Sequence, residues 1–366
     1  MVKVLVVDDS AFVRRSLISI LEKDKEIQVT GTAADGEEAV AKAAQLDPDV
    51  ITMDVEMPKM NGLKALERIM AANPTPVLMV SSMTSEGAST TLRAMELGAM
   101  DYIPKISSGN LHNTQRLENE LCSKIKAIAR RKAFLRLKFK NAGGRQATVA
   151  SCTLPSRTQQ TPPAPHIFHA GGSVAFEIVA IGVSTGGPPA VQKVLSELPG
   201  NFPVPILIAQ HMPASFTGPF ADRLNNLCAI SVKEAEPIER VRPGTVYICP
   251  GGKHLRLENR SGSLMAVVTE EPKDALYKPS ANVLMETAGI AAGNKALGVT
   301  LTGMGYDGLE GTKVLKQRGG WAIAQNEESC VVYGMPKAVV DAGLADEIVD
   351  IKDMSATILS HFQRKA

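Results

Sequence analysis

The sequence is poor in the features that mark several classes of protein. No apolar run approaches the roughly 18 residues of a membrane-spanning helix, so we expect no membrane insertion. The five cysteines are scattered and form no C-x-x-C pair, which favours a reducing, cytoplasmic environment over a disulfide framework. The net charge is only +2, so the chain as a whole has no strong electrostatic field that would favour binding to nucleic acid or to a membrane surface. Asp8 and Asp9 interrupt the first apolar residues too early for a secretory signal.

Aromatic residues are also scarce, at 4%, but the apolar fraction of 44% is typical of a folded globular protein. A chain of 366 residues is long enough for two or three domains. The sequence contains no internal repeat beyond a general alternation of strand and helix patterns.

The first third of the chain alternates between short apolar runs and helical patterns. The runs predict buried parallel strands, and the patterns between them predict helices, with Ser10 as the N-cap of the first helix. Five such units predict an α/β fold with a five-stranded, doubly wound parallel sheet. The strands are expected at residues 3–7, 29–33, 50–53, 77–80 and 100–103, and the helices at 11–21, 37–44, 63–72, 86–97 and from about 113 onward.

A tract without acidic residues follows. Residues 121–176 contain ten Lys and Arg and no Asp or Glu. Its second half, residues 141–173, is rich in Pro, Gly, Ser, Thr and Gln and cannot bury enough apolar surface to offset the cost of ordering, so it predicts a linker. We expect the basic residues before the linker on a solvated helix face or, alternatively, against an acidic partner. No helix-turn-helix or zinc pattern accompanies them, so nucleic acid is not an expected partner.

From residue 177 the alternation of strands and helices resumes. It predicts a second doubly wound α/β domain with a mostly parallel sheet and one hairpin, formed by residues 253–257 and 264–268. The strands are expected at residues 177–183, 205–209, 245–249, 297–301 and 321–324, with a closing helix at 353–362.

Carboxylates cluster at the ends of the first and third predicted strands. Asp8 and Asp9 follow the first strand, and Asp54 follows the third. In the strand order 2-1-3-4-5 these strands are neighbours, so three carboxylates would meet in one small space. Carboxylates at such short distances raise one another's pKa unless a cation neutralises them, and carboxylate oxygens are suitable ligands for Mg²⁺. Taken alone, the Asp8-Asp9 pair is also typical of a helix N-cap.

Two more residues complete this pattern. Ser81 ends the fourth strand and Lys105 follows the fifth, where a hydroxyl and an ammonium group would meet the oxygens of an acyl phosphate. With the Met-Pro and Asn-Gly pairs at residues 57–58 and 61–62, these spacings resemble those of a two-component receiver domain.

That resemblance assigns the residues their roles. It implies Asp54 as the phospho-acceptor, Asp8, Asp9 and Asp54 as Mg²⁺ ligands, and Ser81 and Lys105 as switch residues. The family's lysine is usually followed by proline. Here residue 106 is isoleucine, so the sequence leaves open whether this peptide bond is cis.

Three loops in the second half directly follow predicted strands. They carry Ser184 in Gly-Val-Ser-Thr-Gly-Gly (residues 182–187), His211 in Gln-His-Met-Pro (210–213) and Asp307 in Gly-Met-Gly-Tyr-Asp-Gly (303–308). Ligands bind at the carboxyl ends of parallel strands, so we expect these three side chains to line one crevice. A serine, a histidine and an aspartate are the inventory of a nucleophile, a base and an orienting acid.

Each of the three residues has a simpler interpretation by itself. The glycines around Ser184 suit a tight turn or a phosphate-binding loop as well as a nucleophile. A loop histidine such as His211 is more often structural, and Asp307 before a helical pattern is typical of an N-cap. Their joint placement favours a hydrolytic triad, and the chain order Ser, His, Asp differs from that of the α/β-hydrolases.

Rival nucleophiles and metal ligands are weaker. Cys249 precedes a proline and reads as a turn residue, and we expect His254 to be an exposed residue at the start of the hairpin. Cys152, His166 and His169 lie in the linker and lack paired metal-ligand spacing.

The three loops belong to a wider resemblance. Residues 177–362 resemble the catalytic domain of the chemotaxis protein-glutamate methylesterases, whose architecture is a receiver, a linker and this domain in series. The matching stretches are residues 181–187, 209–213, 246–250, 279–284 and 301–308. The resemblance divides the chain into a receiver at 1–120, a basic helix extension and linker at 121–173, and a methylesterase domain at 174–366.

The resemblance implies a chemistry that agrees with the residues. Ser184 attacks an ester carbonyl, His211 transfers its proton to the departing methanol, and Asp307 fixes the imidazole. Backbone N–H groups at Thr185 and Met304 hold the oxyanion. No cofactor is expected at this site, in contrast to the Mg²⁺ of the receiver.

The resemblance also implies partners. The substrates are glutamate methyl esters of methyl-accepting chemoreceptors, and receptor glutamines for deamidation. A chemotaxis histidine kinase is the phosphodonor for Asp54, and the enzyme is expected to be a monomer in the cytoplasm. A general serine esterase fused to a receiver, and a non-enzymatic phosphate sink that kept the fold, are the alternatives.

Overall fold

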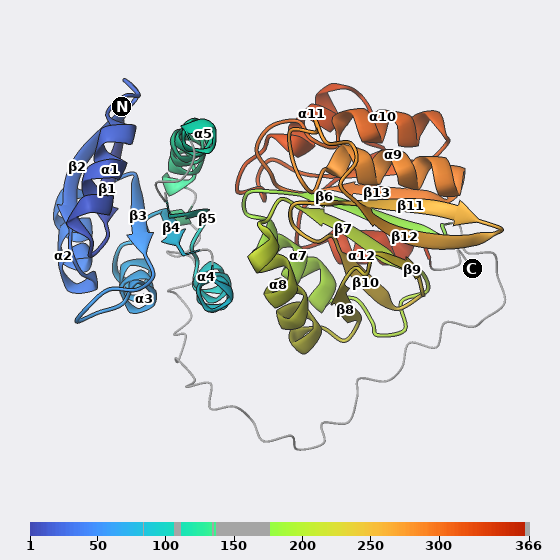
Figure 1. Cartoon of the computed structure of the whole chain (residues 1–366), viewed down its shortest axis with the longest axis horizontal. Helices are drawn as coiled ribbons and strands as arrows, with labels where there is room; N and C mark the ends of the chain where they lie inside the picture. The colour runs from blue at the N-terminus through green and yellow to red at the C-terminus, as the bar shows by residue number, and fades with distance from the viewer. Residues whose placement is uncertain (83, 106–110, 134, 137–175, 363–366) are drawn as a thin grey trace, which may run out of the picture.

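The computed structural model describes residues 1–82, 84–105, 111–133, 135–136 and 176–362, which form two α/β units, each with a parallel sheet (Figure 1). Two predictions fall outside these ranges. They are the linker at residues 141–173, with its Cys152, His166 and His169, and the geometry of the bond that follows Lys105.

The N-terminal sheet has the predicted strand order, β2-β1-β3-β4-β5, and all of its strand pairs are parallel. The doubly wound prediction for this half is therefore confirmed. Its elements are β1 (Val2–Val7), α1 (Ala11–Leu21), β2 (Ile27–Ala33), α2 (Gly36–Leu46), β3 (Val50–Asp54), α3 (Gly62–Ala72), β4 (Val77–Ser81), α4 (Ser85–Glu96), β5 (Asp101–Pro104) and α5 (Leu111–Ala129).

Polar side chains start the helices of this unit. Ser10 is the N-cap of α1, as predicted, and its Oγ accepts a hydrogen bond of 3.4 Å from the N–H of Val13. Asn61 caps α3 in the same way. The next residue, Gly62, packs so closely that a Cβ there would lie 2.0 Å from the carbonyl oxygen of Asp54. The cap and the glycine together let α3 begin directly beside Asp54.

Helix α5 continues past residue 120 and takes part in the core of this unit. Leu121, Ile125 and Ile128 are fully buried in a cluster with residues of β1 and β4. The basic residues that follow pair within the chain, since Lys132 Nζ lies 3.1 Å from Asp47 Oδ1. Acidic groups of the same unit therefore neutralise part of the basic tract. The domain boundaries given above remain predictions.

The C-terminal sheet has the order β15-β14-β13-β6-β7-β10-β8, and its strands are all parallel. Helices α9, α10 and α11 lie on one face, and α7, α8 and α12 lie on the other (Figure 1). The elements are β6 (Ile178–Val183), α7 (Gly187–Ser196), β7 (Ile206–Gln210), α8 (Ala214–Leu227), β8 (Ser231–Glu234), β9 (Ile238–Arg240), β10 (Thr245–Ile248), β11 (His254–Arg260), β12 (Ser263–Thr269), α9 (Ala281–Ala292), β13 (Ala296–Thr300), α10 (Leu309–Gln317), β14 (Trp321–Gln325), α11 (Met335–Asp341), β15 (Glu347–Val349) and α12 (Met354–Ser360).

The predicted hairpin is present as β11 and β12, and it turns at Ser261 and Gly262, which both have positive φ. A third strand, β9, pairs with β12 and was not predicted because it has three residues and no apolar run. The prediction that His254 is exposed was wrong. Its side chain is fully buried, and Nε2 lies 3.2 Å from the carbonyl oxygen of Pro272. The loop after the hairpin therefore covers this histidine, although it stands at the end of a strand.

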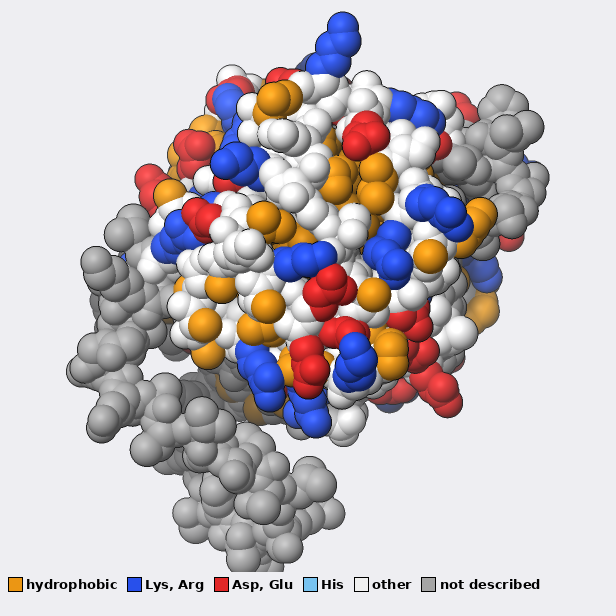
Figure 2. Space-filling model, turned by 90° about the vertical axis from the view of Figure 1, so that its left-hand side faces the viewer, with side chains coloured by type: hydrophobic (Ala, Val, Ile, Leu, Met, Phe, Trp, Pro, Cys, Tyr) orange, Lys and Arg blue, Asp and Glu red, His pale blue; other side chains and the backbone are white. Residues whose placement is uncertain are grey.

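The face of the N-terminal unit that points away from the C-terminal unit carries charges of both signs, with hydrophobic side chains between them (Figure 2). This mixture agrees with the small net charge of +2. Within the described ranges, none of the helices combines the length and apolar character that crossing a membrane requires.

Candidate active site

Ser184, His211 and Asp307 meet at the carboxyl edge of the C-terminal sheet. Ser184 follows β6, His211 follows β7, and Asp307 lies in the loop after β13. Strand β6 lies between β13 and β7 in the sheet, so the connection after β6 runs to one side, toward β7, and the connection after β13 runs to the other side, toward β14. Such a switch point opens a crevice outside the strand ends, which is where the three loops meet.

The three side chains form a continuous hydrogen-bonded row. The distance between His211 Nδ1 and Ser184 Oγ is 3.0 Å, and that between His211 Nε2 and Asp307 Oδ2 is 2.7 Å. An ionised carboxylate only accepts hydrogen bonds, so Nε2 carries the proton and donates a hydrogen bond to Asp307. Nδ1 therefore presents its lone pair to the hydroxyl of Ser184, which is the arrangement a general base requires.

The carboxylate of Asp307 is held at the N-terminus of α9. Oδ2 accepts 2.7 Å from the N–H of Ala281, and Oδ1 accepts 3.0 Å from the N–H of Asn282 and 2.9 Å from Ser280 Oγ. The N-cap alternative for Asp307 was wrong in its detail, because the N-cap of α10 is Gly308 and Asp307 binds the start of a different helix. The free N–H groups and dipole of a helix N-terminus stabilise a negative charge there.

These contacts decide the charge of Asp307. Burial alone would raise the pKa of this carboxyl group, whose side chain is 3% exposed. The hydrogen bonds from His211 and from the backbone of Ala281 and Asn282 outweigh burial and hold its pKa below the ordinary value of 3.8. Asp307 is therefore ionised at neutral pH and can stabilise a protonated His211.

The loop around Ser184 is shaped by glycines. Gly186 has φ of 74°, in the left-handed region, and a Cβ on Gly187 would lie 2.0 Å from Gln210 Oε1. The N–H of Ser184 is already used, since it donates to the carbonyl of Thr302 at 3.0 Å. The backbone N–H groups of Thr185 and Met304 donate to no other residue of the described ranges, which leaves them available to an oxyanion.

Two residues that the sequence did not single out support this row. The buried Gln210 donates from Nε2 to the carbonyl oxygens of Ser184 and His211, at 3.0 and 3.1 Å. Tyr277 stacks on the imidazole of His211, with ring centroids 4.4 Å apart and an angle of 11° between the planes. Gln210 precedes His211 in the Gln-His-Met-Pro motif, but the sequence of this motif does not indicate which carbonyl oxygens the amide of Gln210 reaches.

Cys249, the rival nucleophile, is an unreactive core residue. It is fully buried, and burial raises the pKa of its thiol well above the ordinary value of 9.0. No thiolate is therefore available there.

The acidic site of the N-terminal unit also assembles as predicted in geometry. Asp8, Asp9 and Asp54 each place a carboxylate oxygen within 4.8 Å of the others. Lys105 Nζ lies 2.8 Å from Asp54 Oδ2 and 3.5 Å from Asp8 Oδ2. Ser81 is nearby at the end of β4, but its Oγ accepts a hydrogen bond of 2.6 Å from Thr91.

The electrostatics of this site fit a divalent cation. Burial raises the pKa of Asp54 to about 6 and also raises that of Asp8, although hydrogen bonds and the charge of Lys105 oppose both shifts. Asp8 Oδ2 is buried and accepts no hydrogen bond from the described residues. Two buried carboxylates, one of them with an oxygen that accepts no hydrogen bond, form a donor set that a hard cation such as Mg²⁺ satisfies.

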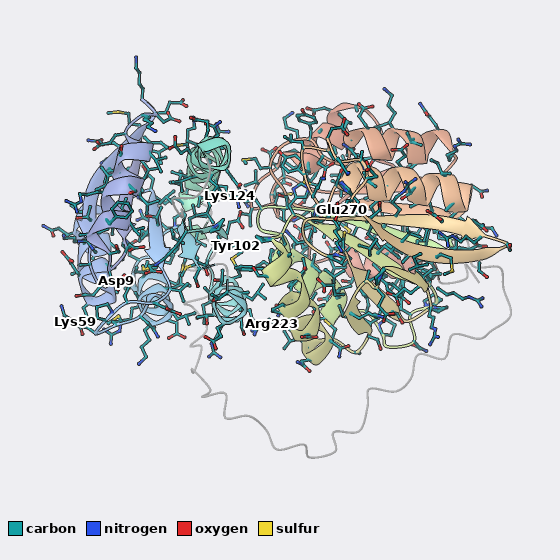
Figure 3. All side chains as sticks on the ribbon, in the orientation of Figure 1. Asp9, Lys59, Tyr102, Lys124, Arg223 and Glu270 are labelled. Atoms are coloured by element: carbon teal, nitrogen blue, oxygen red, sulfur yellow. The ribbon has the colours of Figure 1, made fainter. Side chains whose placement is uncertain are left out.

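The receiver-like unit packs against the C-terminal unit beside the triad. Helix α4 contacts α7 and α8, and α8 begins three residues after His211. Tyr102 of β5 stacks on Phe216 of α8, with centroids 4.6 Å apart and planes 3° apart. Glu96 of α4 pairs with Arg223 of α8, and the Arg223 Nε to Glu96 Oε1 distance is 2.8 Å. Figure 3 places Tyr102 and Arg223 at this junction.

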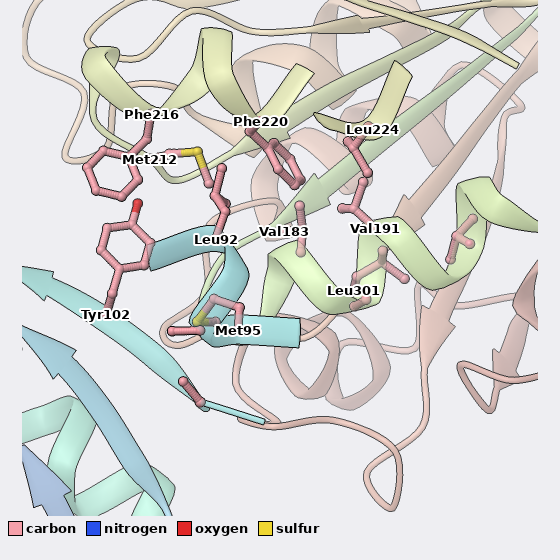
Figure 4. Close-up of a cluster of buried hydrophobic side chains, with 14 of the residues drawn as sticks. Leu92, Met95, Tyr102, Val183, Val191, Met212, Phe216, Phe220, Leu224 and Leu301 are labelled. Atoms are coloured by element: carbon pink, nitrogen blue, oxygen red, sulfur yellow. The ribbon is translucent and has the colours of Figure 1, made fainter. Parts of the chain in front are cut away.

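Apolar side chains close the junction. Leu92 and Met95 of α4 lie with Met212, Phe216 and Phe220 in one buried cluster (Figure 4). Met212 is the residue after His211, so the cluster reaches the loop that holds the imidazole. A second contact joins the two units elsewhere. Arg131, which follows α5, donates a hydrogen bond of 2.7 Å to the carbonyl of Glu328, which follows β14.

Comparison with known proteins adds the following. Residues 179–358 match the CheB methylesterase family, and residues 4–115 match the response regulator receiver domain family. A protein of Oleidesulfovibrio alaskensis named protein-glutamate methylesterase/protein-glutamine glutaminase 1 is 56% identical over 371 aligned residues, which cover 98% of this chain and 99% of that one. A protein of Vibrio cholerae with the same name is 43% identical and covers 98% of both chains.

A solved structure agrees with the second half. The crystal structure of the Thermotoga maritima CheB methylesterase catalytic domain is 40% identical to the aligned region and superposes with a TM-score of 0.50. It covers 51% of this chain and 99% of that one.

The shifted pKa of Asp54 leads to a prediction about stability. Its folded value of about 6 exceeds the ordinary 3.8, so its contribution to folding is fully present below about pH 3.8 and is lost as the pH rises through 6. Near pH 7.5 without divalent cations, Asp54→Asn should therefore stabilise the receiver core by about 1–2 kcal/mol. Hydrogen exchange of peptides from β1 and β3 in the full chain measures this difference.

The same experiment has two internal controls. Near pH 4 the wild type and Asp54→Asn should exchange at the same rate, because Asp54 is then protonated in the wild type. Mg²⁺ should protect the wild type more than the variant. Equal stability of both proteins near pH 7.5 would mean that Asp54 is not strained by burial.

Proposed function

The chain belongs to the protein-glutamate methylesterase/protein-glutamine glutaminase family, and on that premise we propose that Ser184, His211 and Asp307 hydrolyse glutamate methyl esters of chemoreceptors. The observation that carries this assignment of residues is the hydrogen-bonded row of 3.0 and 2.7 Å at the carboxyl edge of the sheet. The proposed reaction is the adaptation step of chemotaxis, in which methyl groups leave the receptors as methanol.

The proposed mechanism has two halves, formation of an acyl-enzyme and its hydrolysis. Ser184 Oγ attacks the ester carbonyl as its proton passes to His211 Nδ1, and the N–H groups of Thr185 and Met304 bind the oxyanion. The tetrahedral intermediate collapses, and the proton moves from His211 to the departing methoxide, which leaves as methanol. Water then attacks the acyl-enzyme with His211 as base, and the glutamate is released. Asp307 keeps Nε2 protonated and stabilises the imidazolium in both halves.

The same groups serve for deamidation of glutamine. Attack on the side-chain amide gives the same acyl-enzyme, and the proton on His211 Nδ1 passes to the leaving nitrogen, so ammonia departs in place of methanol. We propose this second activity because the relatives carry it in their names.

We further propose that the N-terminal unit controls this site through phosphorylation. Asp54 accepts the phosphoryl group of a chemotaxis histidine kinase. Asp8, Asp9 and Asp54 would hold Mg²⁺, which would neutralise charge on the carboxylates and on the phosphoryl oxygens. Lys105 and Ser81 then bind the new phosphoryl oxygens. Lys105 must exchange Asp54 for the phosphoryl group, and Ser81 must exchange Thr91.

The junction gives this switch a route to the triad. Tyr102 and α4 rest on α8, and α8 follows the turn that carries His211. A change in β4 and α4 on phosphorylation would weaken these contacts and release the catalytic unit. We propose a cytoplasmic monomer whose partners are the kinase and the receptors.

The triad should behave as one unit in mutational tests. Ser184→Ala should lower methanol release from methylated receptor membranes by at least about 1,000-fold, because only oxyanion binding and substrate binding remain. His211→Gln and Asp307→Asn should add little to the serine defect. More than about a tenth of wild-type activity in Ser184→Ala would remove Ser184 from the mechanism, and multiplicative losses in the double variants would mean that the residues act separately.

The Glu96–Arg223 ion pair allows a matched test of the switch. Glu96→Arg places two cations together and should raise the basal, unphosphorylated rate about threefold to tenfold. Destabilising the state in which the receiver is docked on α8 by about 1 kcal/mol changes its population relative to the released state by that factor. The double variant Glu96→Arg/Arg223→Glu restores an ion pair and should return the rate to the wild-type value.

Asp54→Asn provides the complementary control. It should remain at the basal rate when a small phosphodonor and Mg²⁺ are added, while the wild type is activated. If the basal rate of the reversed pair stays as high as that of Glu96→Arg, the Glu96–Arg223 ion pair is not the contact that restrains the enzyme.

A further inference from the structure

Tyr277 makes a contact with the triad that the mechanism above does not use. Its ring lies almost parallel to the imidazole of His211, with centroids 4.4 Å apart and 11° between the planes. The row from Ser184 to Asp307 holds the imidazole only by its edges, through Nδ1 and Nε2. Tyr277 therefore supplies a contact to the face of the ring.

The segment that carries Tyr277 is anchored at several points between β12 and α9. The carbonyl of Pro272 is 3.2 Å from Nε2 of the buried His254, and the carbonyl of Lys278 accepts 3.2 Å from the N–H of Gly252. Lys278 Nζ in turn lies 3.4 Å from the carbonyl oxygen of Glu270. The tyrosine ring is thus presented by a braced segment.

The same segment leads directly to the donors of Asp307. Ser280 Oγ and the N–H of Ala281, which follow Tyr277 closely in sequence, donate to this carboxylate at 2.9 and 2.7 Å. One stretch of chain therefore sets the position of the acid that holds the edge of His211 and of the aromatic ring that covers its face.

We propose that Tyr277 is a positioning residue for the general base of the reaction. It fixes the plane of the His211 imidazole, and its π face stabilises the positive charge that His211 carries after it takes the proton of Ser184. This inference rests on the proposed function, because it concerns the same proton transfers.

The geometry explains why edge contacts alone are insufficient. A tilt of the imidazole out of its plane, by rotation about its Cβ–Cγ bond, would lengthen both hydrogen bonds together. Because proton transfer requires a distance of about 3 Å and a lone pair aimed at the proton, a parallel ring that opposes tilting of the imidazole keeps it in the productive plane.

The aromatic face, and not the hydroxyl, carries the argument. The hydroxyl marks the far end of the ring, where a Cβ built on Gly305 would lie 3.3 Å from it. Tyr277→Phe keeps the stacked ring, whereas Tyr277→Leu keeps an apolar side chain and removes the π face. The two variants therefore separate the proposed contact from simple filling of space.

The test compares these variants in the full-length, phosphodonor-activated protein. Turnover of a small neutral ester, p-nitrophenyl acetate, and methanol release from methylated receptor membranes both give kcat and KM. Tyr277→Phe should stay within about threefold of the wild type, and Tyr277→Leu should lower kcat about 10- to 50-fold with KM changed less than about threefold. Trp321→Leu, an aromatic-to-leucine change at a 37% exposed residue at the start of β14, on the sheet edge opposite the site, is the control and should match the wild type.

A spectroscopic measurement supports the kinetics without depending on turnover. In the wild type and in Tyr277→Phe, the stacked ring should shift the ring protons of His211 upfield in the NMR spectrum, and Tyr277→Leu should lose that shift. If the leucine variant does not fold, Tyr277→Met, which is longer and more adaptable, replaces it in both measurements.

The possible outcomes are distinct. Wild-type kcat in Tyr277→Leu overturns the inference, as does a rise in KM with unchanged kcat, which would make Tyr277 a substrate contact. Equal losses in the phenylalanine and leucine variants also overturn it, because the hydroxyl would then be the important group. If the wild type shows no ester hydrolysis above the Ser184→Ala background, the proposed function itself fails, and the inference fails with it.

Discussion

The buried carboxylate of Asp307 is the constraint on which the catalytic unit depends. A charged group with 3% exposure is stable only if several donors replace its water, and here the donors are His211, Ser280, the first N–H groups of α9 and the N–H of Gly308. Satisfying it fixes the start of α9 against the loop after β13. It also fixes the protonated nitrogen of the imidazole, and thus the nitrogen that faces Ser184.

The sheet supplies the second condition. Because β6 lies between β13 and β7, three segments far apart in the sequence end at the same edge within hydrogen-bonding distance of one another. If β13 and β7 did not flank β6, the same three loops would not meet. The N-terminal sheet repeats this principle with β1 and β3, whose ends bring Asp8 and Asp54 together.

Most of the fold and the three triad positions could be predicted because their signals are local. Apolar runs, a cap such as Ser10 and a glycine-flanked Ser184 can all be recognised within a few residues. The short strands β8, β9 and β15 have three or four residues, and their pairing depends on neighbours distant in sequence. The contact of Tyr277 with His211 and the burial of His254 could not be predicted for the same reason. Their importance comes from which side chain packs on them, and no periodicity records that.

Helix α8 has a consequence for how the enzyme can change over generations. One end of it follows the turn with His211, and its flank carries Phe216 and Arg223, which meet the receiver. Under the proposed function, a substitution in α8 that loosens this contact would also disturb the support of the proposed base, His211. Under the proposed function, sensitivity to the signal and speed of turnover would be coupled through α8, whereas a substitution on the α4 side of the contact would change the first without replacing a residue of the helix that follows His211.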